Sequence, residues 1–133
     1  MRPMDLKSKH VLVTGSAKRL GRALTEFFVE QGARVSAHSH VTPFSSLKGA
    51  TPFYADLCKD GAPHKLVQLA RQANGPVDVL INSASVFYPR DASDCSSADW
   101  DETMTLNLKA PYQLRQACYQ DLRVGGGCAI NLC

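Results

Sequence analysis

The chain has 133 residues, a formal net charge of +3 and a hydrophobic content of 44%. A chain of this length forms one domain and buries about two-thirds of its unfolded surface, so it can build a core without a disulfide or a metal. The charge is too small and too evenly spread for a nucleic-acid-binding surface, and no apolar run approaches the ~20 residues that span a membrane. We therefore expect neither nucleic acid nor a membrane as a partner.

The cysteine pattern and the start of the chain indicate a cytoplasmic protein. The five cysteines are odd in number and include no Cys-x-x-Cys pair, which is typical of reduced cytosolic thiols. The first residues carry charge but lack the apolar segment of a secretory signal. His10 and His64 have no partners at metal-ligand spacing, so we expect no metal site.

Strand and helix signals alternate along the whole chain. Short β-branched or apolar runs bounded by glycine suit strands that are buried on both faces. Apolar residues at helical spacing mark the segments between them, and Leu20, Ala23, Leu24, Phe27 and Phe28 form one such stripe. The expected strands are 10–14, 33–40, 52–57, 77–84 and 128–133, and the expected helices are 18–31, 66–73 and 96–122, the last capped by Ser96 or Ser97.

This alternation predicts the α/β fold class, a doubly wound parallel sheet of the Rossmann type that stops after its fifth strand. Crossover connections of this length place helices on both faces of the sheet, and the expected strand order is 3-2-1-4-5. Ligands bind such sheets at the carboxyl ends of the strands, where the order reverses between the first and fourth strands. Residues 1–133 are expected to form one incomplete nucleotide-binding domain.

The segment 14–22, which reads Thr-Gly-Ser-Ala-Lys-Arg-Leu-Gly-Arg, is the strongest motif. It lies between an expected strand and an amphipathic helix, which is the context of a dinucleotide-binding loop. Gly15 would allow a tight turn and Gly21 close packing of the helix, while free backbone N–H groups would hold a pyrophosphate. A plain strand-to-helix turn with two glycines is the alternative.

This loop resembles the cofactor loop of the short-chain dehydrogenases/reductases. Arg19, where that family usually has glycine, resembles the pteridine-reductase branch. Four further segments resemble family motifs in the same order along residues 8–133. They are Asp56-Leu57, Asn82-Ser83-Ala84-Ser85, Phe87-Tyr88-Pro89, and Trp100 followed by Asn107-Leu108-Lys109-Ala110-Pro111.

The residues around the second strand favour NADP(H) over NAD(H). An acidic residue at the end of this strand binds the ribose hydroxyls in NAD-binding proteins, but the chain has no Asp or Glu between Glu30 and Asp56. Basic residues at the loop suit a 2′-phosphate, although Arg19 could also be a solvated residue at a helix start and His40 an exposed loop histidine. The expected cofactor-binding residues are Gly15, Ser16, Ala17, Arg19, Leu20, Gly21, His38, Ser39, His40, Asp56, Leu57, Asn82, Ala84 and Ser85.

The resemblance also implies roles near the substrate. Phe87 would stack on a substrate ring, with a core or lid aromatic as the alternative. Asn107 would be the catalytic residue that holds a water in the proton relay, although it could also cap a helix kink before Pro111. The implied activity is NADPH-dependent reduction of a small pterin-like or carbonyl substrate, and the intact enzyme is expected to be a homo-oligomer.

One part of the family pattern is missing. The family uses a Tyr-x-x-x-Lys pair for proton transfer, and no tyrosine of this chain has a lysine four residues later. We therefore expect the chain to be the inactive N-terminal part of a longer reductase, or else a complete nucleotide-binding or regulatory module. In either case its fifth strand would be an exposed sheet edge that favours weak stability or association.

Overall fold

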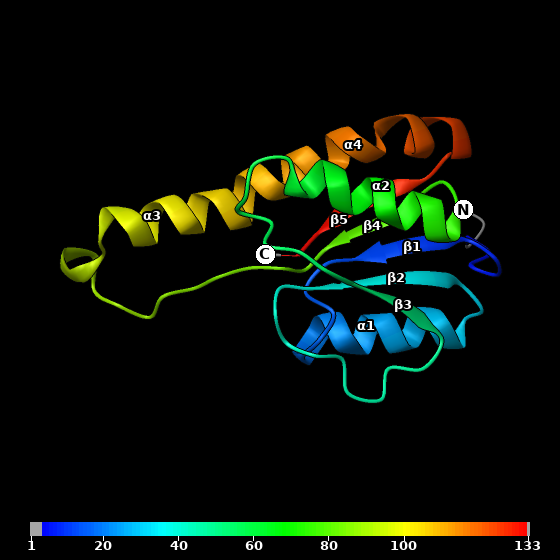
Figure 1. The fold of residues 1–133 in the computed structure, drawn as a ribbon, viewed down its shortest axis with the longest axis horizontal. Helices are drawn as coiled ribbons and strands as arrows, with labels where there is room; N and C mark the ends of the chain where they lie inside the picture. Colours follow the sequence, from blue (N-terminus) through cyan, green and yellow to red (C-terminus); the bar gives the residue numbers. More distant parts are fainter. Residues whose placement is uncertain (1–3, 133) are drawn as a thin grey trace.

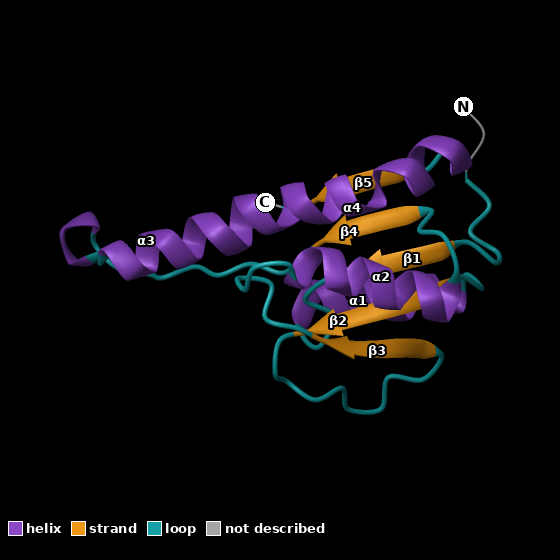
Figure 2. Ribbon diagram, turned by 45° about the horizontal axis from the view of Figure 1, so that its top comes forward, coloured by secondary structure: helices purple, strands orange, loops and turns teal. Residues whose placement is uncertain are grey.

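The computed structural model describes residues 4–132 as a five-stranded parallel sheet with helices on both faces (Figure 1). The strand order is β3-β2-β1-β4-β5, which confirms the predicted order. Figure 2 shows all five arrows pointing in one direction. The elements are β1 (His10–Val13), α1 (Arg19–Glu30), β2 (Arg34–Ser39), β3 (Ala50–Tyr54), α2 (Ala62–Asn74), β4 (Val79–Asn82), a 3₁₀ turn (Ala92–Asp94), α3 (Ser97–Met104), a π-helical segment (Thr105–Lys109), α4 (Ala110–Gly125) and β5 (Cys128–Asn131).

Two apolar layers hold the sheet and helices together. Because successive strand residues point to opposite faces, Leu12 and Leu80 pack in the layer beneath α2 and α4. Val11, Val13 and Ile81 pack in the other layer, against α1. All four residues of β1 and of β4 are buried, as expected for the two strands that flank the reversal of strand order.

The buried face of α1 differs from the predicted stripe. Leu20 and Phe27 are 56% and 48% exposed, so they do not belong to the core. The fully buried positions are Gly21, Thr25 and Phe28. The sequence pattern missed this rotation because it counted apolar side chains, whereas the helix is turned so that Gly21, which has no side chain, meets the end of β1.

The part of the chain between β4 and α4 extends beyond the sheet. In Figures 1 and 2, α3 projects past the carboxyl ends of the strands, and the segment between β4 and α3 runs beside it. The hydroxyl of Ser96 accepts from the backbone N–H of Asp99, and the Asp99 carboxylate accepts from that of Ser96, which confirms Ser96 as the cap of α3. β5 is the outer strand beside β4, and Ile130 is 44% exposed, as expected for a sheet edge.

Candidate cofactor-binding site

A cleft of about 1000 Å³ lies at the carboxyl ends of the strands. This is where ligands bind in doubly wound sheets, and the volume is large enough for a dinucleotide. Four connections supply most of its walls: the loop after β1, the end of β2, the loop after β3 and the segment after β4. The wall toward α3 and the π-helical segment contains Asp101, Glu102, Thr105 and Leu106.

Two glycines allow the backbone to close up at the end of β1. Gly15 has a φ of +68°, and a Cβ built on it would lie 2.9 Å from the backbone N and Cα of Ala84. A Cβ on Gly21 would overlap the carbonyl oxygen of Gly15. Side chains at these two positions would therefore push α1 and the β4 segment apart, which is the steric reason for glycine in this motif.

Thr14 fixes the neighbouring strand end. Its hydroxyl oxygen accepts from the backbone N–H groups of Ser83 and Ala84, both at 3.1 Å, and it lies 3.4 Å from the carbonyl oxygen of Ile81. Thr14 is buried, so these bonds replace water for the polar groups at the end of β4. Thr14 is the first residue of the loop motif, and the motif alone indicates no role for its side chain.

The N-terminus of α1 faces the cleft without a side-chain cap. The cap residue is Lys18, whose side chain has no acceptor to offer the helix N–H groups, and the first turn has no acidic residue. The first-turn N–H groups of a helix have no partners within the helix, and the helix dipole favours an anion there. Ala17, Arg19, Leu20 and Gly21, which the sequence analysis places in the expected phosphate loop, all line the cleft.

Ser16 does not lie in the cleft with its neighbours. It is fully buried, and its hydroxyl donates to the carbonyl oxygen of Val13 at 2.7 Å. Its backbone N–H donates to the carbonyl oxygen of His38, also at 2.7 Å. Ser16 therefore stabilises the turn from inside, because both of its donors are used within the protein.

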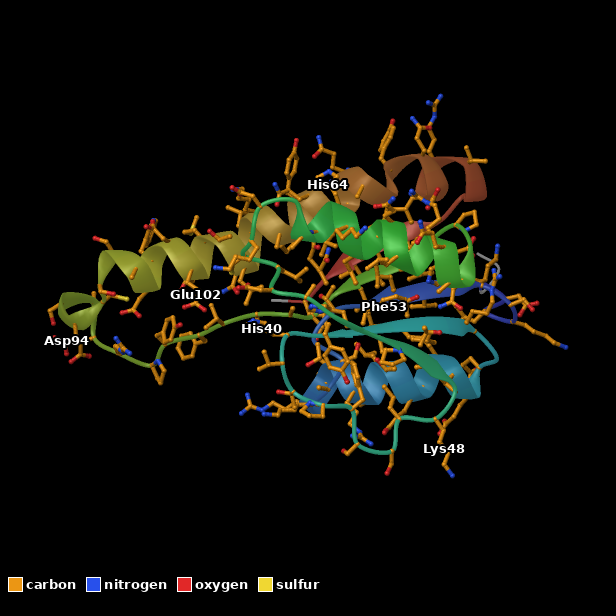
Figure 3. All side chains as sticks on the ribbon, in the orientation of Figure 1. His40, Lys48, Phe53, His64, Asp94 and Glu102 are labelled. Atoms are coloured by element: carbon orange, nitrogen blue, oxygen red, sulfur yellow. The ribbon has the colours of Figure 1, made fainter. Side chains whose placement is uncertain are left out.

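The end of β2 and the loop after β3 form the other end of the cleft. His38, Ser39, His40, Asp56 and Leu57 all line it. Figure 3 labels the exposed His40, whose Nε2 lies 3.9 Å from Oδ2 of Asp56. The other Asp56 oxygen accepts from the backbone N–H of Cys58 at 3.0 Å. Asp56 therefore shapes this loop as well as facing the cleft.

The residues after β4 that are predicted near the nicotinamide do not all line the cleft. Ala84 and Ser85 line it, and so does Ser83, which is not among the predicted site residues. Asn82 is only 3% exposed and donates to Oδ1 of Asn131 on β5 at 2.8 Å, so it joins two strands beneath the cleft. Phe87 is 82% exposed and lies outside the cleft wall.

Asn107 lies in the π-helical segment and holds the chain after β4. Its Oδ1 accepts from the backbone N–H of Val86 at 2.9 Å, and its Nδ2 donates to the carbonyl oxygen of Val86 at 2.8 Å. Both ends of the amide are thus engaged with Val86, a residue of the cleft wall. π-helical turns, which hold one extra residue, are frequent at functional sites. Here the π-helical segment directs the side-chain amide of Asn107 at Val86.

Tyr88 contacts Glu102 of the cleft wall, but its environment does not favour proton donation. Its hydroxyl donates to the carboxylate of Glu102, and this hydrogen bond raises the pKa of Tyr88 above its usual value. A general acid that works near neutral pH needs a lowered phenol pKa instead.

Among residues 4–132, no group of His, Cys, Asp and Glu side chains could hold a metal ion, and no helix is long and apolar enough to cross a membrane.

Comparison with known proteins agrees with this geometry. Residues 9–133 match the family described as short chain dehydrogenase. D-threitol dehydrogenase of Mycolicibacterium smegmatis is 32% identical, over 96% of this chain and 53% of its own length. A short-chain dehydrogenase from Burkholderia cenocepacia in complex with NADP is 25% identical with a TM-score of 0.89, over 96% of this chain and 56% of that one. NADH-dependent reductase A1-R′ in complex with NAD is 27% identical with a TM-score of 0.87, over 96% and 60%.

The chain therefore belongs to the short-chain dehydrogenase family, and two of the solved structures that it resembles hold NADP or NAD. It spans about half the length of the curated relatives that it matches. The named relatives belong to branches other than the pteridine reductases.

The contact between Gly21 and Gly15 gives a direct test of the loop geometry. We expect Gly21→Ala to lower the free energy of unfolding by about 3 kcal/mol, because the new Cβ meets rigid backbone. Urea denaturation followed by circular dichroism measures this change.

Gly125→Ala is the matched control. Its Cβ would lie 3.3 Å from Oδ1 of Asp78 and would meet no backbone atom, so a shift of a few tenths of an ångström suffices and a change within about 0.5 kcal/mol is expected. Equal stability of the two variants would contradict the close approach of α1 to the end of β1.

Proposed function

We propose that the whole protein is an NADPH-preferring reductase of small molecules and that this chain supplies its cofactor-binding half. The observation that carries the proposal is the cleft at the strand ends, where an uncapped helix N-terminus, basic side chains and two required glycines come together. Backbone donors and a helix dipole at such a point suit a diphosphate.

The cleft residues fit the parts of a dinucleotide in order. Arg19, Leu20 and Gly21 would bind the diphosphate, and Asp56 with Leu57 would contact the adenine. The charge of Asp56 is opposed by Lys59, whose Nζ lies 4.0 Å from Oδ2 of Asp56, which limits the repulsion of phosphate by this carboxylate. Ala84 and Ser85 would border the nicotinamide ribose. The cofactor supplies a hydride when it is bound, and the residues of this chain orient it.

The conformation of Arg19 supports a preference for the 2′-phosphate. Its φ of +51° lies in the left-handed region, which costs a non-glycine residue roughly 1–2 kcal/mol. Glycine would avoid this cost, so a strained arginine at the mouth of the cleft indicates that its charge has a use. Ser39 and His40 stand where NAD-binding proteins have an acidic residue, so the end of β2 itself contributes no carboxylate that would repel a phosphate. Arg22 is already paired with Glu26 at 2.9 Å and Ser45 at 3.0 Å.

The test of this preference is Arg19→Gly, which removes the charge without adding strain. We expect the dissociation constant for NADPH to rise at least tenfold, because one charge-assisted contact to phosphate is worth about 1.5–3 kcal/mol. Binding of NADH should change less than threefold. Fluorescence titration with both cofactors measures the difference, and urea denaturation should show no loss of stability.

Arg115→Ala, on the exposed side of α4, is the control for a general loss of positive charge. It should bind both cofactors as the unchanged protein does. Equal weakening of NADPH and NADH by Arg19→Gly would argue against a 2′-phosphate contact.

We further propose that the substrate is a pterin-like or related carbonyl compound. The support is Phe87, an aromatic ring that is 82% exposed directly after Val86, which lines the cleft and is held by Asn107. An exposed ring beside a cofactor cleft can stack on a flat heterocycle.

Phe87→Ala should weaken folate binding to the NADP⁺-loaded protein about fivefold, because stacking adds on the order of 1 kcal/mol beyond burial. Trp100→Ala, which removes an exposed aromatic from α3, is the control and should bind folate normally. Isothermal titration calorimetry measures both. Unchanged affinity in Phe87→Ala would rule out the stacking role.

The remaining expectations concern the whole protein. No Tyr-x-x-x-Lys pair occurs in residues 1–133, so we assign proton transfer to other residues of the protein, with Asn107 as a positioning residue. A cytoplasmic location is supported by the free thiols of the four described cysteines. A homo-oligomer is supported by the exposed apolar side chains of Leu108 in the π-helical segment and of Tyr112 and Tyr119 on α4.

A further inference from the structure

His38 connects the two ends of the cofactor cleft. It is the residue before the last in β2 and is only 2% exposed. Its Nε2 lies 2.9 Å from the carbonyl oxygen of Ala55, and its Nδ1 lies 3.4 Å from the backbone N of Gly15. Its own carbonyl oxygen accepts from the backbone N–H of Ser16 at 2.7 Å. One residue thus contacts the phosphate loop twice and the loop after β3 once.

These partners determine where the imidazole proton lies. The carbonyl oxygen of Ala55 can only accept, so Nε2 must carry the hydrogen that it receives. Nδ1 then has a free lone pair, which accepts the N–H of Gly15. Only the neutral ring with its hydrogen on Nε2 satisfies both partners, because a hydrogen on Nδ1 would face another donor.

The contacts also decide which loop donors are left for a ligand. The N–H groups of Gly15 and Ser16 are used by His38, so they are unavailable to a phosphate. Their engagement fixes the turn that aims the first-turn N–H groups of Arg19, Leu20 and Gly21 at the cleft. On the other side, Ala55 immediately precedes Asp56, which lines the opposite wall.

We propose that His38 is a positioning residue that sets the spacing between the diphosphate and adenine ends of the cleft through its neutral, Nε2-protonated imidazole. The inference rests on the proposed function for the identity of the ligand. The contacts that carry it are within the protein and can be tested without any ligand.

The state of His38 gives the site a dependence on pH. Burial lowers the pKa of His38 below its usual value, the bond to Ala55 opposes this, and His40 lowers the pKa further. The neutral ring is therefore the form at pH 7, and the Gly15 contact is lost as the pH falls through the lowered pKa. The charged or titratable groups that line the same cleft are Lys18 and Arg19 from the first loop, His40 after β2, Asp56, Cys58 and Lys59 after β3, and Asp101 and Glu102 on α3.

The first experiment uses the protein without ligand. Nitrogen-15 NMR of the histidine rings should show the Nε2-protonated form of His38 and proton uptake only below pH 6.5. Two variants separate the contacts, since glutamine can place a donor near Nε2 and asparagine an acceptor near Nδ1. In His38→Gln the amide hydrogen of Gly15 should exchange at least fivefold faster, and in His38→Asn it should stay closer to the original rate.

The second experiment measures dinucleotide binding between pH 8 and pH 5.5. NADH is the probe, because it lacks the 2′-phosphate, which itself titrates in this range. The unchanged protein should bind NADH more weakly as the pH falls, while His38→Gln should bind about tenfold more weakly at pH 8 and with a flatter profile. Circular dichroism at each pH confirms that the fold persists.

His64→Gln is the matched control, because His64 is exposed on α2 and contributes nothing to the cleft wall (Figure 3). It should keep both the affinity and the pH profile. A hydrogen on Nδ1 of His38, proton uptake at the pKa of an exposed histidine, or an unchanged profile in His38→Gln would overturn the proposal. If the unchanged protein binds neither NADH nor NADPH at pH 8 while the ring state and Gly15 exchange are as expected, the positioning role stands and the proposed cofactor function fails.

Discussion

The close approach of backbone to backbone at the end of β1 is the constraint on which the rest of the molecule depends. Gly21 lies against the carbonyl oxygen of Gly15, and Gly15 lies against Ala84. This contact sets the rotation of α1, which in turn decides that Thr25 and Phe28 are buried while Leu20 and Phe27 are exposed. It also brings the N-terminus of α1 to the point where the sheet order reverses, so the fold and the cleft have one cause.

The sequence predicts the fold well because the relevant signals are local and repeated. Buried strands appear as short apolar runs, crossovers of helix length require parallel strands, and the sheet order follows from the handedness of those crossovers. The exposed part of the chain that contains α3 and the π-helical segment is harder to predict from the sequence. Its π-helical segment depends on the contact between Asn107 and Val86, which are 21 residues apart, and composition carries no signal for such a contact.

The structure brings most of the predicted site residues to the wall of one cleft, but two of the buried ones bond differently from the expectation. Ser16 and Asn82 match cofactor motifs, yet the two donors of Ser16 bond to Val13 and His38, and Nδ2 of Asn82 bonds to Asn131, all inside the protein. A motif gives the residue type, and only the packing shows which way a side chain points. Ser83 belongs to the same quoted motif, and its place in the cleft wall follows from the Thr14 hydroxyl that holds its backbone. Arginine at position 19 does not itself indicate the left-handed conformation that the structure shows. The glycine that the family usually has at this position is the one sequence signal for it.

The central claim is that a nicotinamide dinucleotide lies across the carboxyl ends of the strands, from the loop after β3 to the segment after β4. Titration of the nitrogen-15-labelled protein with NADP⁺, followed by amide chemical shifts, tests it most directly. We expect the largest chemical-shift changes at the amides of Arg19, Leu20 and Gly21, with further changes at those of Leu57 and Ser85. Absence of changes at the phosphate loop, or changes confined to the exposed face around Leu108 and Tyr112, would contradict it.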